Sequence, residues 1–303
     1  MSYEPSPSQS LGPLSIGNVV NVGLRIYRDH FKLYYRLAFI GYLWLLVPIY
    51  GWAKFSAMFG LISRLAFREI IERPETVNEA RRHVNPRMWS FFRAGILVFL
   101  ITFGVAILVS LITWVAIMVI IVLLSILIGV LASIAGNSST ILDSLDTLPE
   151  NSVAMVIIGF LVLSIFMIGF LFGLSWFIFR LFIYEITLAI ENSIGARAAI
   201  GRSWKLTQGF ILRIQGIVVV GFLISLPISI VVQIVILIIQ NVLSLLFTEE
   251  SAILAWLLYL VLVFGLTFAS SALLVPFWQA IKSVIYYDLC SRKEGIDLQL
   301  WVS

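Results

Sequence analysis

The sequence is poor in the residues that build metal centres and soluble enzymes. Only 12% of its 303 residues are charged, against about 25% in soluble domains. It has a single cysteine, Cys290, and two histidines, His30 and His83. One cysteine forms no internal disulfide, and three Cys or His side chains are fewer than the roughly four ligands of a structural zinc or iron–sulfur site. We therefore expect no metal ion and no cofactor.

Sequence motifs of common catalytic sites are missing as well. The chain contains no GxxxxGK[ST] phosphate loop, no HExxH zinc motif and no GxSxG nucleophile elbow. No nucleophile, base and orienting partner are grouped along it, so we predict that the protein is not an enzyme. The opening residues 1–14 lack the basic and apolar regions of a signal peptide, and we expect them to form a disordered tail.

Long apolar runs dominate the rest of the chain, in which 61% of all residues are hydrophobic. Four runs contain no charged side chain: 94–133, 153–179, 214–247 and 251–281. A hydrocarbon core of about 30 Å is crossed by about 20 helical residues, so each run is long enough to span it. The sequence predicts an all-α integral membrane protein with four long spanning helices. Gly104 and Gly129 are candidate bends in the first run, and Pro227 and Pro276 are expected to kink or end the last two helices.

The basic residues all fall on one side of this arrangement. The connections 134–152 and 248–250 contain no Lys or Arg but carry five acidic residues. The remaining segments hold all 20 Lys and Arg and 11 of the 16 acids, a net charge of +9. Because basic loops stay inside, we predict that these segments and both termini are cytoplasmic, in a bacterial cytoplasmic-type membrane.

The apolar region 37–62 differs from the four runs. It carries one charge, Lys54, and has Pro48 and Gly51 near its centre. Both of its flanks are basic, so it must cross the membrane an even number of times. We predict a re-entrant helical hairpin that turns near Pro48 and Gly51. The alternative is a single crossing with a cationic N-terminal helix outside.

Three amphipathic stretches lead into apolar segments: 15–36, 76–85 and 193–209. In the first stretch, apolar residues such as Ile16, Val19 and Val20 recur at helical spacing opposite basic residues. The second opens with Thr76-x-x-Glu79, a capping-box pattern. We expect all three to be helices that lie along the cytoplasmic surface of the membrane.

Segments that leave the membrane also match one another. The octapeptide ISRLAFRE at 62–69 aligns without gaps to IFRLFIYE at 178–185. We interpret the chain as one membrane domain, 15–303, with a three-fold internal repeat. Its units are about 15–75, 76–192 and 193–303, each with an interfacial helix, an apolar hairpin and a basic exit.

Basic side chains on these stretches are the candidate binding residues, because the arginine fork suits phosphate. The candidate lipid- or partner-binding residues are Arg25, Arg28, Lys32, Lys54, Arg81, Arg82, Arg180, Arg197, Arg202 and Lys205. Two have a second interpretation, since Arg180 and Lys54 can also extend to the interface and remain solvated there. Similarly, the amides Gln233, Gln240 and Asn241 either line a polar path or hydrogen-bond between helices.

Three passages carry a resemblance to a known family: LSIGNVVNVGLRIYRDHFKLYYRLAF near the start, AIGRSWKLTQGFILR, and IYYDLCSRKEGIDLQL at the end. They resemble a widespread bacterial family of polytopic membrane proteins. That family is related to the membrane domain attached to some glycerophosphodiester phosphodiesterases. The resemblance implies a helical, non-catalytic membrane module, because hydrolysis in the fused proteins belongs to a separate soluble barrel for which this chain has no room.

Together these features favour a structural or interaction module in the membrane. It would bind anionic lipid or a protein partner through its basic cytoplasmic face. The expected partners are membrane lipids and either another membrane protein or a second copy of the chain, with no nucleic acid. The alternative is a subunit of a transporter or channel, and a lipid-modifying enzyme ranks third.

Overall fold

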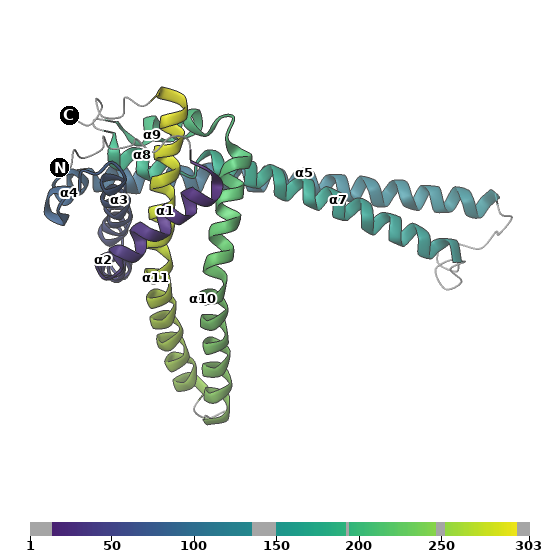
Figure 1. Cartoon of the computed structure of the whole chain (residues 1–303). Helices are drawn as coiled ribbons and strands as arrows, with labels where there is room; N and C mark the ends of the chain where they lie inside the picture. The colour runs from purple at the N-terminus through teal and green to yellow at the C-terminus, as the bar shows by residue number, and fades with distance from the viewer. Residues whose placement is uncertain (1–13, 135–149, 192–193, 247–251, 296–303) are drawn as a thin grey trace, which may run out of the picture. The chain divides into compact units, whose positions relative to one another are not determined.

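The computed structural model describes residues 14–134, 150–191, 194–246 and 252–295 (Figure 1). These residues form helices and no strand. The predicted tail and the acidic connections lie almost wholly outside the described residues. The chain divides into two compact units, one made of Met1–Val98 with Phe179–Ser303 and the other of Phe99–Ile178.

Four of the helices are long and apolar enough to cross a membrane. They are α5 (Met88–Ile134), α7 (Glu150–Arg180), α10 (Ile211–Leu246) and α11 (Ala252–Glu294). The predicted all-α class and the four long apolar helices are confirmed. Pro227 and Pro276 do not end their helices, because α10 and α11 continue through them, and α5 likewise continues through the candidate bends Gly104 and Gly129.

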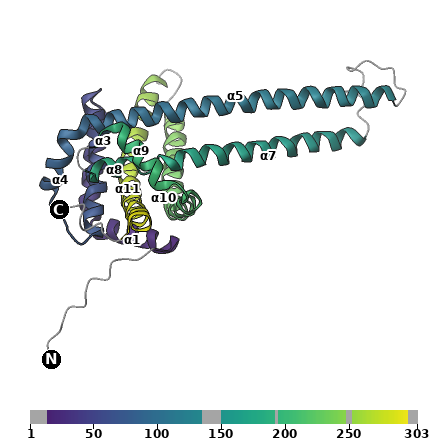
Figure 2. The same ribbon diagram turned by 90° about the horizontal axis from the view of Figure 1, so that it is seen from above.

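The unit Phe99–Ile178 is a helical hairpin in which α5 and α7 run side by side (Figure 2). Most of its large apolar side chains are exposed. An open apolar groove between the two helices is lined by Val109, Ile112, Thr113, Ile165, Phe166, Gly169 and Phe170. Side chains of this kind, exposed around most of each helix, suit hydrocarbon rather than water as their surroundings.

In the other unit, the C-terminal half of α11 is the central helix. It is buried on nearly every side from Pro276 to Cys290, and α1, α2, α3, α8, α9 and α10 all contact α11. Helix α1 (Ile16–Asp29) crosses α11 closely, because a methyl group at Gly23 would lie 3.0 Å from Ile281 Cγ1. At about 1.5 Å per residue the 43 residues of α11 extend about 65 Å, roughly twice a hydrocarbon core.

A second helical hairpin packs along α11. It consists of α2 (Phe31–Trp44) and α3 (Tyr50–Ile70), which turn at residues 45–49, close to the predicted Pro48. Ile49 has a positive φ of 61° in this turn. The Tyr42 ring lies 5.5 Å from Phe268, and Ser63 Oγ donates a 2.7 Å hydrogen bond to Gln279 Oε1. The tip of the hairpin therefore points toward the exposed apolar half of α11.

The first amphipathic stretch is not one helix, and the prediction of a continuous helix over 15–36 is wrong. Helix α1 ends at Asp29, His30 has φ −113° and ψ 21°, and α2 begins at Phe31. The physical reason is packing: α1 lies across α10 and α11, whereas α2 runs along α3, so the chain must change direction between them. No proline or glycine marks the break.

The remaining short helices are α4 (Val77–Val84), the 3₁₀ turn η1 (Asn85–Arg87), α8 (Tyr184–Ile190) and α9 (Ala196–Thr207). Both hydrogen bonds of the predicted capping box are present at the start of α4. Thr76 Oγ1 accepts from the Glu79 backbone N–H, and a Glu79 carboxylate oxygen accepts from the Thr76 N–H at 2.8 Å. Short helices thus precede the α2–α3 hairpin, the α5–α7 hairpin and the packed pair of α10 and α11 in chain order.

Candidate functional site

Most of the basic residues fall into two groups, which differ in exposure and in hydrogen bonding. Members of the first group are at least partly buried and bind carboxylates or backbone carbonyls: Arg64, Arg68, Arg87, Arg180, Arg202, Arg213, Lys282 and Arg292. Members of the second group are exposed and make no side-chain hydrogen bond or ion pair with a described residue: Arg25, Lys32, Arg36, Arg73, Arg82, Arg197 and Lys205. The first group holds the fold together, and the second is available to bind something else.

Arg64 is the most deeply buried of the first group, with 3% of its side chain exposed. Its fork binds both carboxylate oxygens of Glu75 at 2.8 Å, and Nη1 donates to the Ala189 carbonyl at 3.0 Å. Arg68 reaches the same carboxylate at 2.7 Å. This cluster ties α3 to the loop before α4 and to the end of α8, as the planar geometry of arginine allows.

Arg202, one of the predicted binding residues, is committed to two carboxylates. It lies 2.8 Å from Glu191 and 2.5 Å from Glu294, and the hydrogen bond that it donates to Glu294 is the main cause that raises the pKa of the guanidinium. Glu191 also accepts a 2.9 Å hydrogen bond from the Tyr286 hydroxyl. Arg202 thereby fastens α9 to the end of α11, and its donors are directed at protein rather than at lipid phosphate.

Arg180 is likewise turned inward. Only 8% of the residue is exposed, and its guanidinium lies 4.8 Å from the centre of the Trp204 ring. Its backbone carbonyl accepts hydrogen bonds from Ser203 Oγ and Thr207 Oγ1, at 2.9 and 3.3 Å. The side chain is therefore buried where α7 ends against α9, and it does not extend into solvent as the interfacial interpretation expected.

Three acids near basic residues, Glu69, Glu185 and Asp288, bind different partners. Glu69 faces His30 at 4.0 Å, whereas Glu185 accepts from Lys282 at 2.8 Å and from Gln279 at 3.0 Å. The described structure therefore does not bring Glu69, Glu185 and Asp288 together as one carboxylate cluster, and each sits in its own set of contacts.

Asp288 forms the third of these sets and is only 2% exposed. Its carboxylate contacts Arg213 at 3.0 Å and Arg292 at 3.1 Å, and it accepts the Leu14 N–H at 2.9 Å. The Leu14 carbonyl in turn accepts from both arginines. This clamp on the backbone before α1 was missed from sequence. Its one signal was an acid and an arginine four residues apart near the chain end, a spacing common on any helix.

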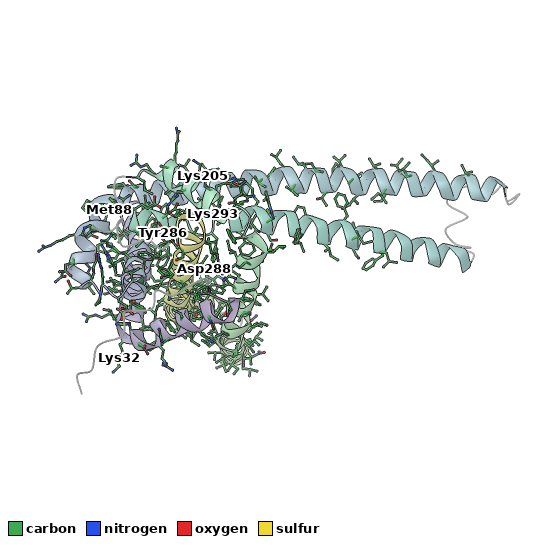
Figure 3. The ribbon with its side chains drawn as sticks, turned by 45° about the horizontal axis from the view of Figure 1, so that its top comes forward. Lys32, Met88, Lys205, Tyr286, Asp288 and Lys293 are labelled. Carbon is green, nitrogen blue, oxygen red and sulfur yellow. The ribbon has the colours of Figure 1, made fainter. Side chains whose placement is uncertain are left out.

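Three members of the second group lie on α1 and the start of α2. Arg25, Lys32 and Arg36 are exposed, and among the described residues Arg28 pairs with its neighbour Asp29 alone, at 3.5 Å and with 78% of the side chain accessible. Figure 3 shows Lys32 at the edge of the packed helices, whereas Tyr286 and Asp288 lie among them.

The other candidates are spread over three further helices. Arg82 on α4 and Arg197 and Lys205 on α9 are exposed, and Arg81 is partly buried. Lys54 on α3 is also partly buried, and its Nζ lies 5.8 Å from the centre of the Tyr50 ring.

Helix α1 lies at a defined level along α11. The Tyr27 hydroxyl donates to the Leu273 carbonyl at 2.8 Å, and its ring lies 6.0 Å from Phe277. At its start, Ile16 Cδ1 would be 3.1 Å from a methyl group at Gly216 on α10. This is the level at which α11 changes from an exposed apolar helix to a buried one. Burial of the hydroxyl raises the pKa of Tyr27 to about 12, so it stays a neutral donor.

Searches of protein-family models, curated proteins and solved structures found no match to this chain. The site is therefore interpreted from its own geometry. Among the described residues, no three His, Cys, Asp or Glu side chains are placed to hold a metal ion, and Cys290 is buried as a free thiol. The arrangement offers cations at the surface of a helical scaffold, and most of the buried polar groups form hydrogen bonds within the protein.

Proposed function

We propose that this protein is a non-catalytic membrane module that binds anionic lipid headgroups through the exposed cations of α1 and α2. A protein partner with an acidic surface is the second ligand that the same cations would accept. The observation that carries the proposal is the placement of Arg25, Lys32 and Arg36. They are exposed and unpaired among the described residues. Their helices lie at the level where α11 changes from an exposed apolar helix to a buried one.

The electrostatic free energy of these cations is large enough to give a preference for anionic lipid. Each Lys or Arg near an anionic membrane surface contributes about 1 kcal/mol. Three such residues correspond to roughly a hundredfold preference for an anionic over a zwitterionic lipid at low salt. The arginine fork adds two parallel hydrogen bonds to a phosphate. Arg180 and Arg202 contribute none of this, since both are bound within the protein.

The test compares two variants of the full chain in lipid nanodiscs. The triple variant Arg25→Gln, Lys32→Gln, Arg36→Gln removes the charges, and Arg25→Lys with Arg36→Lys keeps them. Retention of phosphatidylglycerol against phosphatidylcholine with the same acyl chains is measured by native mass spectrometry. We expect the triple variant to lose the preference for phosphatidylglycerol and the lysine variant to keep most of it.

Two results would count against the lipid proposal. Wild-type protein that retains both lipids equally would remove its basis, as would a triple variant that behaves like wild type. If the triple variant instead lost a co-purifying acidic protein while lipid retention stayed the same, the ligand would be that protein. A purified chain that turned over a lipid or phosphodiester would contradict the non-catalytic part of the proposal.

We also propose that α2 and α3 enter the membrane part-way as a re-entrant hairpin. Ser63 contacts Gln279 and Tyr42 contacts Phe268, so the hairpin runs about 16 Å along α11 between these contacts. That is about half of a hydrocarbon core. The exposed side chains at its tip are apolar, among them Leu46 and Val47. The spin relaxation of nitroxide labels at these two positions should be enhanced by lipid-soluble oxygen and little affected by a water-soluble nickel complex.

This hairpin is the one observation that favours the alternative, a subunit of a transporter. Lys54 lies near its tip, beside Phe55, which packs on Tyr42 at 5.2 Å. A cation at such a depth is costly, and in membrane proteins it often marks a substrate path. Lys54 can also extend to the interface, where an anionic headgroup would bind it. Flux of an anionic solute into vesicles that Lys54→Met abolished would favour transport over the module.

The proposed topology places both termini in the cytoplasm of a bacterial cell. It rests on the absence of Lys and Arg from 134–152 and 248–250, and on the three-unit repeat and family resemblance that accompany it. Reporter fusions at residues 14 and 303 should both give a cytoplasmic signal. An external signal at residue 14 would support a single crossing by 37–62 instead of the hairpin.

A further inference from the structure

One face of α10 carries a row of polar side chains inside a candidate membrane span. Gln233, Gln240 and Ser244 lie at i, i+7 and i+11, with the apolar Leu237 at i+4 and Asn241 beside them. All five are exposed, and all belong to the span Ile211–Leu245. Residues at this spacing lie on one side of a helix. This amide face does not coincide with the face of α10 that is buried, which includes Ser225 and Leu243.

The hydrogen bonds of this face are incomplete. Asn241 Nδ2 donates to the Leu237 carbonyl and Ser244 Oγ to the Asn241 carbonyl, both at 2.8 Å within the same helix. The side-chain amides of Gln233 and Gln240 make no hydrogen bond with any described residue. Hydroxyls elsewhere in the long helices differ, since Ser110 and others each donate to their own backbone. An amide left unsatisfied in hydrocarbon costs several kcal/mol, so both glutamines require a partner.

We propose that the amide face of α10 binds the same face of a second copy of this chain, to give a parallel dimer about an axis along the membrane normal. A glutamine amide carries both donors and an acceptor, so it is complementary to itself. A two-fold axis places Gln233 against Gln233 of the partner subunit at the same depth, and the same holds for Gln240.

The seven-residue interval between the two glutamines supports a helix pair in particular. Positions separated by seven stay on the seam of two supercoiled helices, with Leu237 and Ser244 at the intervening seam positions. Polar side chains of this kind hold transmembrane helices together. A different protein would need donors and acceptors at two matching depths, whereas a second copy has them by construction. This inference does not depend on the anionic-lipid proposal, which concerns other helices.

The first experiment measures association in lipid vesicles by energy transfer between labelled copies as the protein is diluted with lipid. The variant Gln233→Leu with Gln240→Leu should weaken association on the order of tenfold to a hundredfold. The control Val235→Leu with Val242→Leu changes exposed residues at similar depths on the opposite side of α10 and should leave association unchanged. Because all four positions are exposed, neither variant disturbs the packed core.

Disulfide trapping in native membranes gives a second, independent measurement. Gln233→Cys should form a cross-linked dimer on mild oxidation and Val235→Cys should not. The wild-type chain, whose Cys290 is buried, provides the background. A wild-type chain that is monomeric at all dilutions would overturn the proposal, as would a dimer that the glutamine variant leaves intact. Cross-linking of Gln233→Cys to a different protein would also overturn it, by assigning the face to another partner. Loss of solute flux in the glutamine variant without loss of association would overturn it too, by assigning the face to a polar path.

Discussion

The ion pair between Arg64 and Glu75 provides the sharpest test of how the buried cations stabilise the fold. In Arg64→Ala, the Ala189 carbonyl loses its donor and Glu75 loses two of its three short contacts, while Arg68 still binds it at 2.7 Å. Breaking a buried pair from one side costs about 3–5 kcal/mol. Because Arg68 remains and Glu75 is 14% exposed, we expect the lower end, about 3 kcal/mol. This corresponds to a fall in Tm of roughly 6–12 °C by the scaling for chains of 150–250 residues.

The matched control is Arg28→Ala, which removes an exposed pair with Asp29. Exposed pairs contribute at most about 1 kcal/mol, so its Tm should fall by no more than about 4 °C. Unfolding of both variants is followed by tryptophan fluorescence in the same detergent. Arg64→Lys should fall between them, because an ammonium cannot form two parallel hydrogen bonds to one carboxylate. Equal Tm values for Arg64→Ala and Arg28→Ala would refute the argument that burial decides the contribution of each cation.

Two further predictions concern the central helix. Gly23→Leu should lower the free energy of unfolding by about 1–3 kcal/mol, since even a methyl group there would lie 3.2 Å from Ile281 Cα. The control Gly17→Leu has open space around it. Thermal unfolding that ranks the two variants equally would contradict the close crossing of α1 and α11. Arg202→Ala should release α9, so that its amides exchange with deuterium faster while those of α3 do not, and unchanged exchange in α9 would show that the contact with Glu294 is dispensable.

The sequence predicted the long helices well because the signal is physical and local. An uncharged run such as 214–247 identifies its span by length alone, and the structure places α10 at Ile211–Leu246. The capping box at Thr76 was predictable for the same reason, since donor and acceptor lie within three residues. The break at His30 was not, because it follows from how α1 and α2 pack against distant helices. No local residue preference marks it.

Whether each arginine is bound within the protein or left exposed was the least predictable feature, and the reason is general. Arg25 and Arg202 both lie on amphipathic stretches that precede apolar segments, and their local sequence gives the two residues the same expectation. Arg202 is bound because Glu294, 92 positions away, packs beside it. Arg25 has no such carboxylate among the described residues. Pairing between distant residues depends on the fold. Sequence alone therefore identifies a set of candidate cations, and only the packing shows which are paired within the protein and which remain exposed to bind a ligand.

The two halves of α11 have different surroundings, which explains why so many polar side chains are buried around its second half. Its first half, with exposed residues such as Ile253 and Val261, needs only hydrocarbon around it, whereas its second half is surrounded by six other helices. Those helices approach from different directions, and hydrophobic contacts alone do not fix their rotation about α11. Gln279, Lys282 and Asp288 supply that orientation, since each forms directional hydrogen bonds to a different neighbouring element. A protein that orients these helices with polar contacts leaves exposed mainly those cations that its packing does not use, and most of the exposed cations lie on α1, the start of α2, α4 and α9.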